Sequence, residues 1–281
     1  MDGFEDGVSI ITIVLNGESL IEETIKSVIH QKNVHIEYII VDGGSTDKTL
    51  ERIALFKEEI SFIISEPDEG IYYAINKGIS LAHCPLVGLI HCGDRYTPDA
   101  ISLANIVFKE TGADIVYGDI QVTEELAKDY FLKELTAKHE LLRNGMSIFH
   151  PSTFVKRTCY LEIGVYDLVY RTAADYDLFL HFFLLNRSFV HIPKVLAVFQ
   201  AGGTSSSHFF LSVKENFLIR KRRLGSRNAI KDIALRLILF LFFTARKSFI
   251  QMLVGRRRYF SLKKKYNNPS AKIECNKNVY E

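Results

Sequence analysis

The chain has 281 residues, of which 47% are hydrophobic and 24% are charged, so it can bury the core of one large domain, with or without an appendage. Residues 1–213 carry 17 Lys and Arg against 29 Asp and Glu, a balance of −12, whereas residues 214–265 carry 16 against 2, a balance of +14. The acidic part argues against nucleic-acid binding and suits a metal ion, and the basic, apolar part suits an anionic membrane surface.

The first part of the chain alternates between strand-like and helix-like segments. Short β-branched apolar runs predict strands at 8–15, 36–41, 61–65 and 85–90, and apolar residues at helical spacing predict helices at 19–31, 49–56 and 71–82. This rhythm predicts parallel βαβ units. Ligands of such sheets bind outside the carboxyl ends of the strands, which is where the polar clusters at 16–17, 42–47, 66–70 and 91–95 fall.

The pattern changes after residue 114. We expect a strand at 114–122, a less periodic stretch up to 149–155, a loop at 164–170 and a helix at 173–185. Two short strands, at 188–192 and 195–199, and a loop at 202–205 follow. No internal repeat is visible.

Asn16 and Asp42 follow the first two predicted strands, so they are expected side by side at adjacent strand tips. An Asp at this place can accept the imide N–H of a uracil, while backbone groups at the strand ends hold the ring. The alternative is a turn followed by a helix that Ser45 or Thr46 caps. No G-x-G-x-x-G fingerprint is present, which removes the main support for a hydride-transfer enzyme.

Asp94 closes the fourth predicted strand in the segment HCGD at 91–94. A divalent cation such as Mg²⁺ or Mn²⁺ can be held by one or two carboxylates together with the phosphates of a ligand. Asp94 is placed to bind such a cation. The alternative is a cap of the next helix, near Pro98.

Asp68 precedes the helix predicted at 71–82, and Lys77 lies on it. Lys77 is a candidate partner of a phosphate, and Asp68 of a ribose or a metal-bound water. The alternative for Lys77 is an ordinary exposed lysine.

Asp175 and Asp177 open the helix predicted at 173–185 and face different sides of it, so they are expected to do different jobs. A carboxylate at this point can accept the proton of an attacking hydroxyl group. The alternative is an acid that the helix dipole favours at an N-terminus.

Taken together, these motifs resemble the family 2 glycosyltransferases of bacterial polysaccharide synthesis. They are SIITIVLN at 9–16, VDGGSTD at 41–47, SEPDEGIYYAINKG at 65–78 and AADYDL at 173–178. The resemblance covers about residues 8–205, and four ordered motifs are more specific than any one. It implies a GT-A fold, with a Rossmann-like, mostly parallel central sheet flanked by helices, a nucleotide-diphosphate sugar donor and inversion at the anomeric carbon.

The resemblance also implies roles for individual residues. Asp42 is similar to the uracil contact, Asp94 to the last acid of the D-x-D metal motif and Asp175 to the catalytic base. The full set of expected nucleotide contacts is Thr12, Leu15, Asn16, Asp42, Ser45, Asp68, Lys77 and Gly93.

The chain departs from the family pattern at two motifs. The segment Cys92-Gly93-Asp94 leaves one carboxylate for the metal, so weak or phosphate-dependent metal binding is expected. The base motif reads Ala174-Asp175, which keeps the base and drops its acidic neighbour. His150 and His208 are candidate acceptor-side or metal groups, with a structural or surface role as the alternative.

The implied function is transfer of a sugar from a nucleotide-diphosphate donor, with UDP favoured, to a hydroxyl of a glycan or of a polyprenyl-diphosphate-linked saccharide in cell-surface polysaccharide synthesis. One alternative is a nucleotidyltransferase, which usually needs a Gly-rich loop with Arg or Lys after the first strand, and residues 16–19 supply neither. The other alternative is a catalytically inactive, membrane-associated partner.

The domain expected at 1–213 has a donor half at about 1–122 and an acceptor half at about 123–213. Residues 214–265 are expected to form a basic amphipathic helical extension, and residues 266–281 a disordered tail. The longest apolar run of the extension, 237–243, is far short of the roughly 20 residues that a membrane span needs, so we expect an interfacial anchor on the inner face of the cell membrane. The alternative is that the extension packs on the catalytic domain or on another subunit. Nucleic-acid binding is less favoured, because bulky aliphatic side chains, which offer no platform on which bases could stack, lie between the basic residues of the extension.

A cytoplasmic location is expected on two grounds. No secretory signal precedes the first strand. Four cysteines lie far apart without a C-x-x-C pair, which argues against a zinc site or a disulfide framework and favours a reducing compartment.

Overall fold

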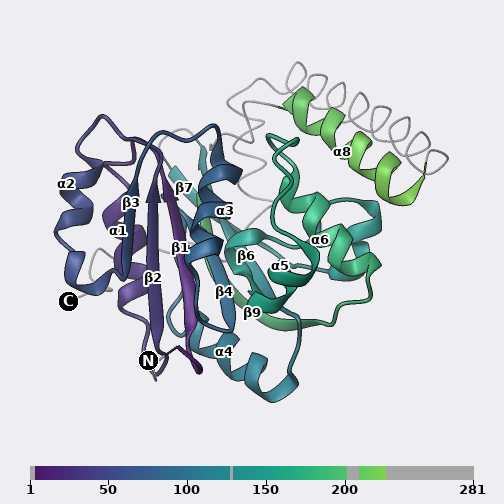
Figure 1. The fold of residues 1–281 in the computed structure, drawn as a ribbon, viewed down its shortest axis with the longest axis horizontal. Coiled ribbons are helices and arrows are strands. Elements are labelled where there is room, and N and C mark those ends of the chain that lie inside the picture. Colours follow the sequence, from purple (N-terminus) through teal and green to yellow (C-terminus); the bar gives the residue numbers. More distant parts are fainter. Residues whose placement is uncertain (1–3, 127–128, 201–208, 226–281) are drawn as a thin grey trace. The chain divides into compact units, whose positions relative to one another are not determined.

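The computed structural model describes residues 4–126, 129–200 and 209–225 (Figure 1). In these ranges one nine-stranded sheet runs in the order β3-β2-β1-β4-β8-β6-β9-β5, and β7 pairs with β6. The expected α/β class, with a mostly parallel sheet flanked by helices, is confirmed.

Four parallel strands form the first half of the sheet: β1 (Val8–Val14), β2 (Ile36–Asp42), β3 (Phe62–Ser65) and β4 (Leu86–His91). The second half is mixed and contains β5 (Arg95–Tyr96), β6 (Ile115–Leu126), β7 (Asp129–Leu135), β8 (Thr153–Lys156) and β9 (Phe189–Gln200). β8 is antiparallel to both β4 and β6, and β9 is parallel to β6. The antiparallel β8 therefore joins the two halves into one sheet.

Helices cover both faces of the sheet, because the central strands are apolar on both sides. Alternate residues of a strand point to opposite faces, so in β1 Ile10 and Val14 belong to one hydrophobic core and Ile11 and Ile13 to the other. The first core includes residues of α1 (Ile21–Ile29), α2 (Thr49–Ala54) and α4 (Ala100–Thr111). The second includes residues of α3 (Ile71–Leu81), α5 (Arg157–Ile163) and α6 (Ala174–Leu184). Figure 1 shows α3 crossing the near face of the sheet.

One difference from the sequence prediction lies at the far end of the sheet. The two short strands expected at 188–192 and 195–199 form the single strand β9, whose pairing with β6 shifts between Ile192 and Val195. Pro193 has no N–H to donate and interrupts the ladder at this point. The strand continues after a bulge instead of ending.

The helix α8 (Phe209–Leu224) belongs to the same compact unit as the sheet, which extends to Ser226. The boundary expected after residue 213 therefore falls inside a helix of this unit. Residues 226–281, with most of the expected basic extension and tail, lie outside the described residues. Among the helices that the structure describes, none has the length and apolarity to cross a membrane.

Candidate active site

The carboxyl ends of β1 and β2 meet in a hydrogen-bonded pair of loops. The N–H of Asn16 donates to Oγ of Ser45 at 2.7 Å, and the N–H of Thr46 donates to Oδ1 of Asn16 at 2.9 Å. The N–H of Gly43 donates to the carbonyl of Val14 at 2.9 Å. The expected neighbourhood of the first two strand tips is confirmed.

Asp42 organises its own turn. Its carboxylate is fully buried, and Oδ2 accepts hydrogen bonds from the N–H groups of Gly44 and Ser45, at 3.1 and 3.0 Å, and from Oγ of Ser65 at 2.7 Å. Oδ1 accepts a hydrogen bond from Oγ of Ser45. The direct uracil contact expected from Asp42 stays a prediction, and the structure adds that both carboxylate oxygens hold the turn and Ser65 of β3 in place. Ser45 is likewise engaged with Asp42 and Asn16.

Two further expected nucleotide contacts lie on or after β1. Thr12 is fully buried inside β1 and shares a 3.0 Å hydrogen bond with the Tyr38 hydroxyl, so its side chain belongs to the core, and its contact with a nucleotide stays a prediction. Leu15 is 62% exposed at the tip of the same strand. A side chain added at Gly43 would touch both Leu15 and Oδ2 of Asp68, so these three residues share one surface beside the strand tips.

Asp68 and Lys77 form an ion pair. Nζ of Lys77 lies 2.8 Å from Oδ1 of Asp68 and 2.6 Å from Oε1 of Glu66. The hydrogen bond with Asp68, followed by the one with Glu66, raises the pKa of Lys77. Oδ2 of Asp68 is buried and has no hydrogen-bond partner in the described part of the chain. This oxygen is therefore the free acceptor of the group, and the charge of Lys77 is already balanced by two carboxylates.

Asp94 follows the carboxyl end of β4, which pairs with β1 on the side opposite β2. Only 4% of it is exposed, and Oδ1 accepts a hydrogen bond from the N–H of Gln200 at 2.9 Å. Burial raises the pKa of Asp94 to about 6. Gly93 adopts a φ of +101°, which a side chain rarely tolerates, and donates its N–H to Oγ1 of Thr24 at 2.9 Å. The alternative that Asp94 caps the next helix is excluded, because α4 has Asp99 at its N-cap.

Two imidazoles adjoin Asp94. Nε2 of His150, in the short 3₁₀ helix His150–Ser152, lies 3.8 Å from Oδ2 of Asp94, and its ring centroid lies 4.4 Å from that of His91. Burial lowers the pKa of His91 to about 3 and that of His150 to about 4, so both rings are neutral at pH 7. Nδ1 of His91 and Nε2 of His150 have no hydrogen-bond partner among the described residues.

These groups fit a weakly held divalent cation. Within the described ranges no three His, Cys, Asp or Glu side chains are arranged to hold a metal by themselves. Asp94 supplies one hard oxygen, and the orphaned Nε2 of His150 supplies one imidazole nitrogen, a pair that Mn²⁺ accepts. The remaining ligands would have to come from a bound diphosphate, which agrees with the expected phosphate-dependent binding. His208 lies outside the described residues.

Asp175 lies in the first turn of α6. Its Oδ1 accepts hydrogen bonds from the Tyr72 hydroxyl at 3.4 Å and from the N–H of Tyr176 at 2.8 Å. Burial raises the pKa of Asp175, and the nearby His150 acts in the opposite direction. Asp177 faces away and pairs with Arg223 at 2.7 Å, so the two acids make different contacts, and a different role for each stays a prediction.

The structure thus brings the ends of distant segments to one edge of the sheet. Tyr72 begins α3, directly after the loop that follows β3, and it ties Asp175 to this edge. His150 lies within electrostatic range of both Asp94 and Asp175. Tyr72, His91 and Gln200 are the members of this group that sequence reasoning missed. Only His91 had a signal, since it stands three positions before Asp94.

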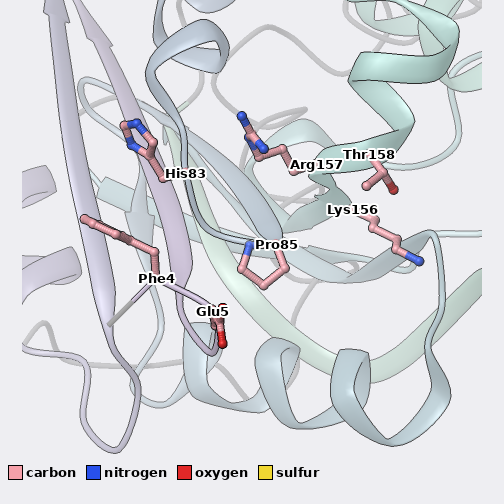
Figure 2. A pocket seen from close by; sticks show the side chains of 7 residues that line it. All are labelled: Phe4, Glu5, His83, Pro85, Lys156, Arg157 and Thr158. Carbon is pink, nitrogen blue, oxygen red and sulfur yellow. The ribbon is translucent and has the colours of Figure 1, made fainter. Parts of the chain in front are cut away.

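A cavity of about 350 Å³ lies elsewhere (Figure 2). It is lined by Phe4, Glu5, His83, Pro85, Lys156, Arg157 and Thr158. Phe4 and Glu5 precede β1, and Pro85 precedes β4. The cavity is therefore at the amino ends of the parallel strands, opposite the carboxylates described above.

Comparison with known proteins identifies relatives of this chain. Residues 9–169 match the family model described as glycosyl transferase family 2. A glycosyltransferase of PGL/p-HBAD biosynthesis from Mycobacterium bovis is 29% identical over 236 residues, which cover 79% of this chain and 88% of the relative. The hyaluronan synthase of Pasteurella multocida is 28% identical over 230 residues, 78% of this chain but only 23% of that enzyme.

Two solved structures share the fold at low sequence identity. S. aureus TarS 1–349 in complex with UDP-GlcNAc aligns with a TM-score of 0.62 and 15% identity over 76% of this chain, which spans 64% of that structure. The mannosyltransferase PcManGT from Pyrobaculum calidifontis, in complex with GDP-Man and Mn²⁺, aligns with a TM-score of 0.58 and 14% identity over 92% of this chain and 84% of its own.

Proposed function

The chain belongs to glycosyltransferase family 2 and is a glycosyltransferase with the GT-A fold, and we propose that it moves a sugar from a nucleotide-diphosphate donor to a hydroxyl group with inversion at the anomeric carbon. The observation that carries the proposal is the grouping of Asp94, His150 and Asp175 at one edge of the sheet. Leaving-group stabilisation and proton removal are the two tasks of such a transfer, and this edge offers a group for each.

Asp175 is the proposed general base. Its carboxylate accepts the proton of the acceptor hydroxyl as the oxygen attacks the anomeric carbon from the face opposite the leaving group. The Tyr72 hydroxyl and the N–H of Tyr176 both donate to Oδ1, which leaves Oδ2 for the acceptor. A carboxylate held at two points presents its remaining oxygen in a fixed direction, and this orientation lowers the entropic cost of reaction.

Asp94 and His150 would hold the divalent cation. When bound, Mg²⁺ or Mn²⁺ neutralises the charge that develops on the departing diphosphate. Asp94 contributes the charged ligand, and its Oδ1 stays fixed by the N–H of Gln200. The neutral imidazole of His150 can either bind the cation or donate a hydrogen bond to an oxygen of the donor.

The surface of Leu15, Gly43 and Asp68 is the proposed site for the nucleoside. Exposed Leu15 offers an apolar face to a base, Gly43 leaves room beside it, and the unpartnered Oδ2 of Asp68 can accept from a base N–H or a ribose hydroxyl. Asp42 and Asn16 keep the loops beside this surface in place. Uridine remains the favoured base, because an acceptor for the imide N–H stands at the site. The structure of TarS in complex with UDP-GlcNAc lends support, and PcManGT with GDP-Man keeps guanosine as the alternative.

The proposed acceptor is a saccharide, either free or linked to a polyprenyl diphosphate, in the synthesis of a cell-surface glycan. The relatives named for PGL/p-HBAD biosynthesis and for hyaluronan synthesis support a role of this kind. We further propose that the part of the basic segment that follows α8, residues 226–265 with 11 Lys and Arg against one Asp, holds the enzyme on the anionic inner face of the membrane, where its charge of +10 favours binding. Vesicles with and without anionic lipid would test that placement.

A screen of nucleotide sugars tests the function directly. The purified full-length protein, with MnCl₂, is expected to release a nucleoside diphosphate from one donor class slowly alone and faster with a saccharide acceptor. Release of pyrophosphate from a nucleoside triphosphate would instead indicate a nucleotidyltransferase. Turnover of no donor with any acceptor would contradict the proposal.

A further inference from the structure

The helix α6, which carries Asp175, has no capping side chain at its N-cap residue, Ala173. Within its first turn, Asp175 accepts a hydrogen bond from the N–H of Tyr176. Unpaired N–H groups at a buried helix start cost free energy, and Ser, Thr, Asp or Asn usually satisfies them. The segment that leads into α6 therefore needs a hydrogen-bond acceptor from another part of the chain.

Glu215, on α8, supplies that acceptor. Its Oε1 accepts from the N–H of Arg171 at 2.8 Å, and its Oε2 accepts from the N–H and Oγ1 of Thr172, both at 2.8 Å, and from the N–H of Ala173 at 3.1 Å. The carboxylate is buried. One side chain thus satisfies three consecutive backbone groups, and its negative charge lies where the dipole of α6 favours it.

Arg223 makes a second bond between the same two helices. Its Nε lies 2.9 Å from Oδ1 of Asp177 and its Nη2 lies 2.7 Å from Oδ2. The side chains of Arg223 and Asp177 are only 18% and 4% exposed. A two-pronged guanidinium–carboxylate pair fixes orientation as well as distance. The two contacts bind α6 to α8 at residues 173 and 177, on either side of Asp175.

We propose that Glu215 and Arg223 are positioning residues for Asp175, so that α8 sets the alignment of the catalytic base. The inference rests on the proposed function, because it assigns the base role to Asp175. The base itself touches neither residue, and its link to them is the first turn of α6. A displacement of about 1 Å at such a group can cost about 10²-fold in rate, so a small shift of this turn is enough to slow transfer.

Glu215→Gln in the full-length protein tests the first contact. The amide keeps the shape of the side chain but presents an NH₂ group to backbone donors and loses the charge. We expect kcat to fall about tenfold or more, the KM for the donor to stay within about twofold, and the acid limb of the pH profile of kcat to move. Lys221→Gln is the matched control, since Lys221 is an exposed residue of the same helix, and it should leave all three quantities unchanged.

Arg223→Lys tests the second contact, because it keeps the charge and removes the two-pronged geometry. We expect a smaller loss of kcat than in Glu215→Gln, again without a change in donor KM. A merely structural role would instead lower the active fraction, so the pH profile of the remaining activity would not move.

Hydrogen exchange provides a measurement that does not depend on turnover. Amides of 171–177 should exchange faster in Glu215→Gln, while those of β1–β4 keep their rates. If wild-type protein turns over no donor, the proposed function fails and the exchange result alone decides whether α8 holds α6. If wild-type protein is active and Glu215→Gln keeps both its kcat and its slow exchange at 171–177, the inference is overturned and the proposed function stands.

Discussion

The Tyr72 hydroxyl donates a hydrogen bond to Oδ1 of Asp175 at 3.4 Å, although 103 positions separate the two residues in the chain. Tyr72 lies in the first turn of α3, beside the carboxyl ends of β1 and β2, so this contact ties α6 to the edge of the sheet where Asp94 lies. Burial raises the pKa of Asp175, and the Tyr72 hydrogen bond lowers it. Together with His150 and the N–H of Tyr176, the Tyr72 hydroxyl therefore opposes the effect of burial on the pKa of the proposed base.

Tyr72→Phe should move the acid limb of the pH profile to higher pH. A hydrogen bond to a carboxylate favours its charged form, so loss of the hydroxyl raises the pKa of Asp175 further. Because the base must be ionised, activity then disappears at a higher pH as the solution is acidified. Measurement of kcat against pH checks this. Tyr73→Phe, on the exposed neighbour, should leave the profile in place, and an unmoved acid limb in Tyr72→Phe would contradict the assignment.

Mn²⁺ should stabilise the protein more at neutral pH than at acidic pH. Burial raises the pKa of Asp94 to about 6, so folding favours the neutral carboxyl, and this stabilisation is lost as the pH rises through about 6. A cation on the ionised carboxylate offsets that loss. The increase in Tm caused by MnCl₂ should therefore be larger at about pH 7.5 than at about pH 5, where protons compete.

Asp94→Asn is the companion variant for the metal. It should remove the Mn²⁺-dependent increase in Tm, and without metal it should be at least as stable as the wild type at about pH 7.5, because no buried charge remains. Differential scanning fluorimetry over this pH range gives both quantities. An Mn²⁺ effect that survives in Asp94→Asn would place the cation elsewhere.

Asp42→Asn should lower the stability of the fold and thereby disturb the proposed nucleotide-binding loops. The carboxylate accepts hydrogen bonds from two N–H groups and two hydroxyls. The NH₂ group of an asparagine is itself a donor, so it cannot accept the hydrogen bonds of the donors that face it. A buried group left unsatisfied costs about 1–3 kcal/mol, so we expect urea unfolding to show a loss of this size and the donor KM to rise. Ser65→Ala, which removes one of the four donors, should cost less. A variant with wild-type stability and a raised donor KM would contradict this explanation and indicate that Asp42 contacts the base directly.

Gly78→Ala should destabilise the fold although alanine is the better helix former. A Cβ at Gly78 would lie 2.4 Å from Cγ2 of Ile11 in β1, so α3 has to move away from the sheet. Such overpacking costs about 1–3 kcal/mol, against a gain in helix propensity of about 1 kcal/mol. Urea unfolding checks the net loss. Ser80→Ala, exposed on the same helix, should be neutral or stabilising, and a Gly78→Ala variant as stable as Ser80→Ala would contradict the close packing of α3.

The first half of the sheet could be predicted from the sequence because short sequence patterns indicate each of its strands and helices. Strands β1, β2 and β4 are continuous apolar runs, and α3 has apolar residues at helical spacing, so their order and their ligand-binding edge follow from general rules. Asn16 and Asp94 could be placed on that edge for the same reason. In the mixed second half β6, α6 and β9 could be predicted as elements, but β8 and α5 could not, since β8 contributes four residues and α5 seven, too few to show a period.

The contacts that shape the proposed base could not be predicted either. The sequence around Asp175 does not predict a contact with Tyr72 or Glu215, because both residues come close to this segment only through tertiary packing. The direction of the Thr12 side chain is a further example, because this side chain points into the core and pairs with Tyr38. The positions of the strands could be predicted from the sequence, whereas the direction of an individual side chain is determined by packing in the folded structure.

The role of Asp175 is the central claim, and one comparison tests it most directly. The Asp175→Asn variant is compared with wild type for the rate of sugar transfer and for the affinity for the donor's nucleoside diphosphate with MnCl₂, and Glu162→Gln, an exposed acid of α5, is the control. We predict a loss of about 10²–10⁴-fold in kcat with nucleotide affinity unchanged, and no effect in the control. Transfer at the wild-type rate by Asp175→Asn would contradict the account.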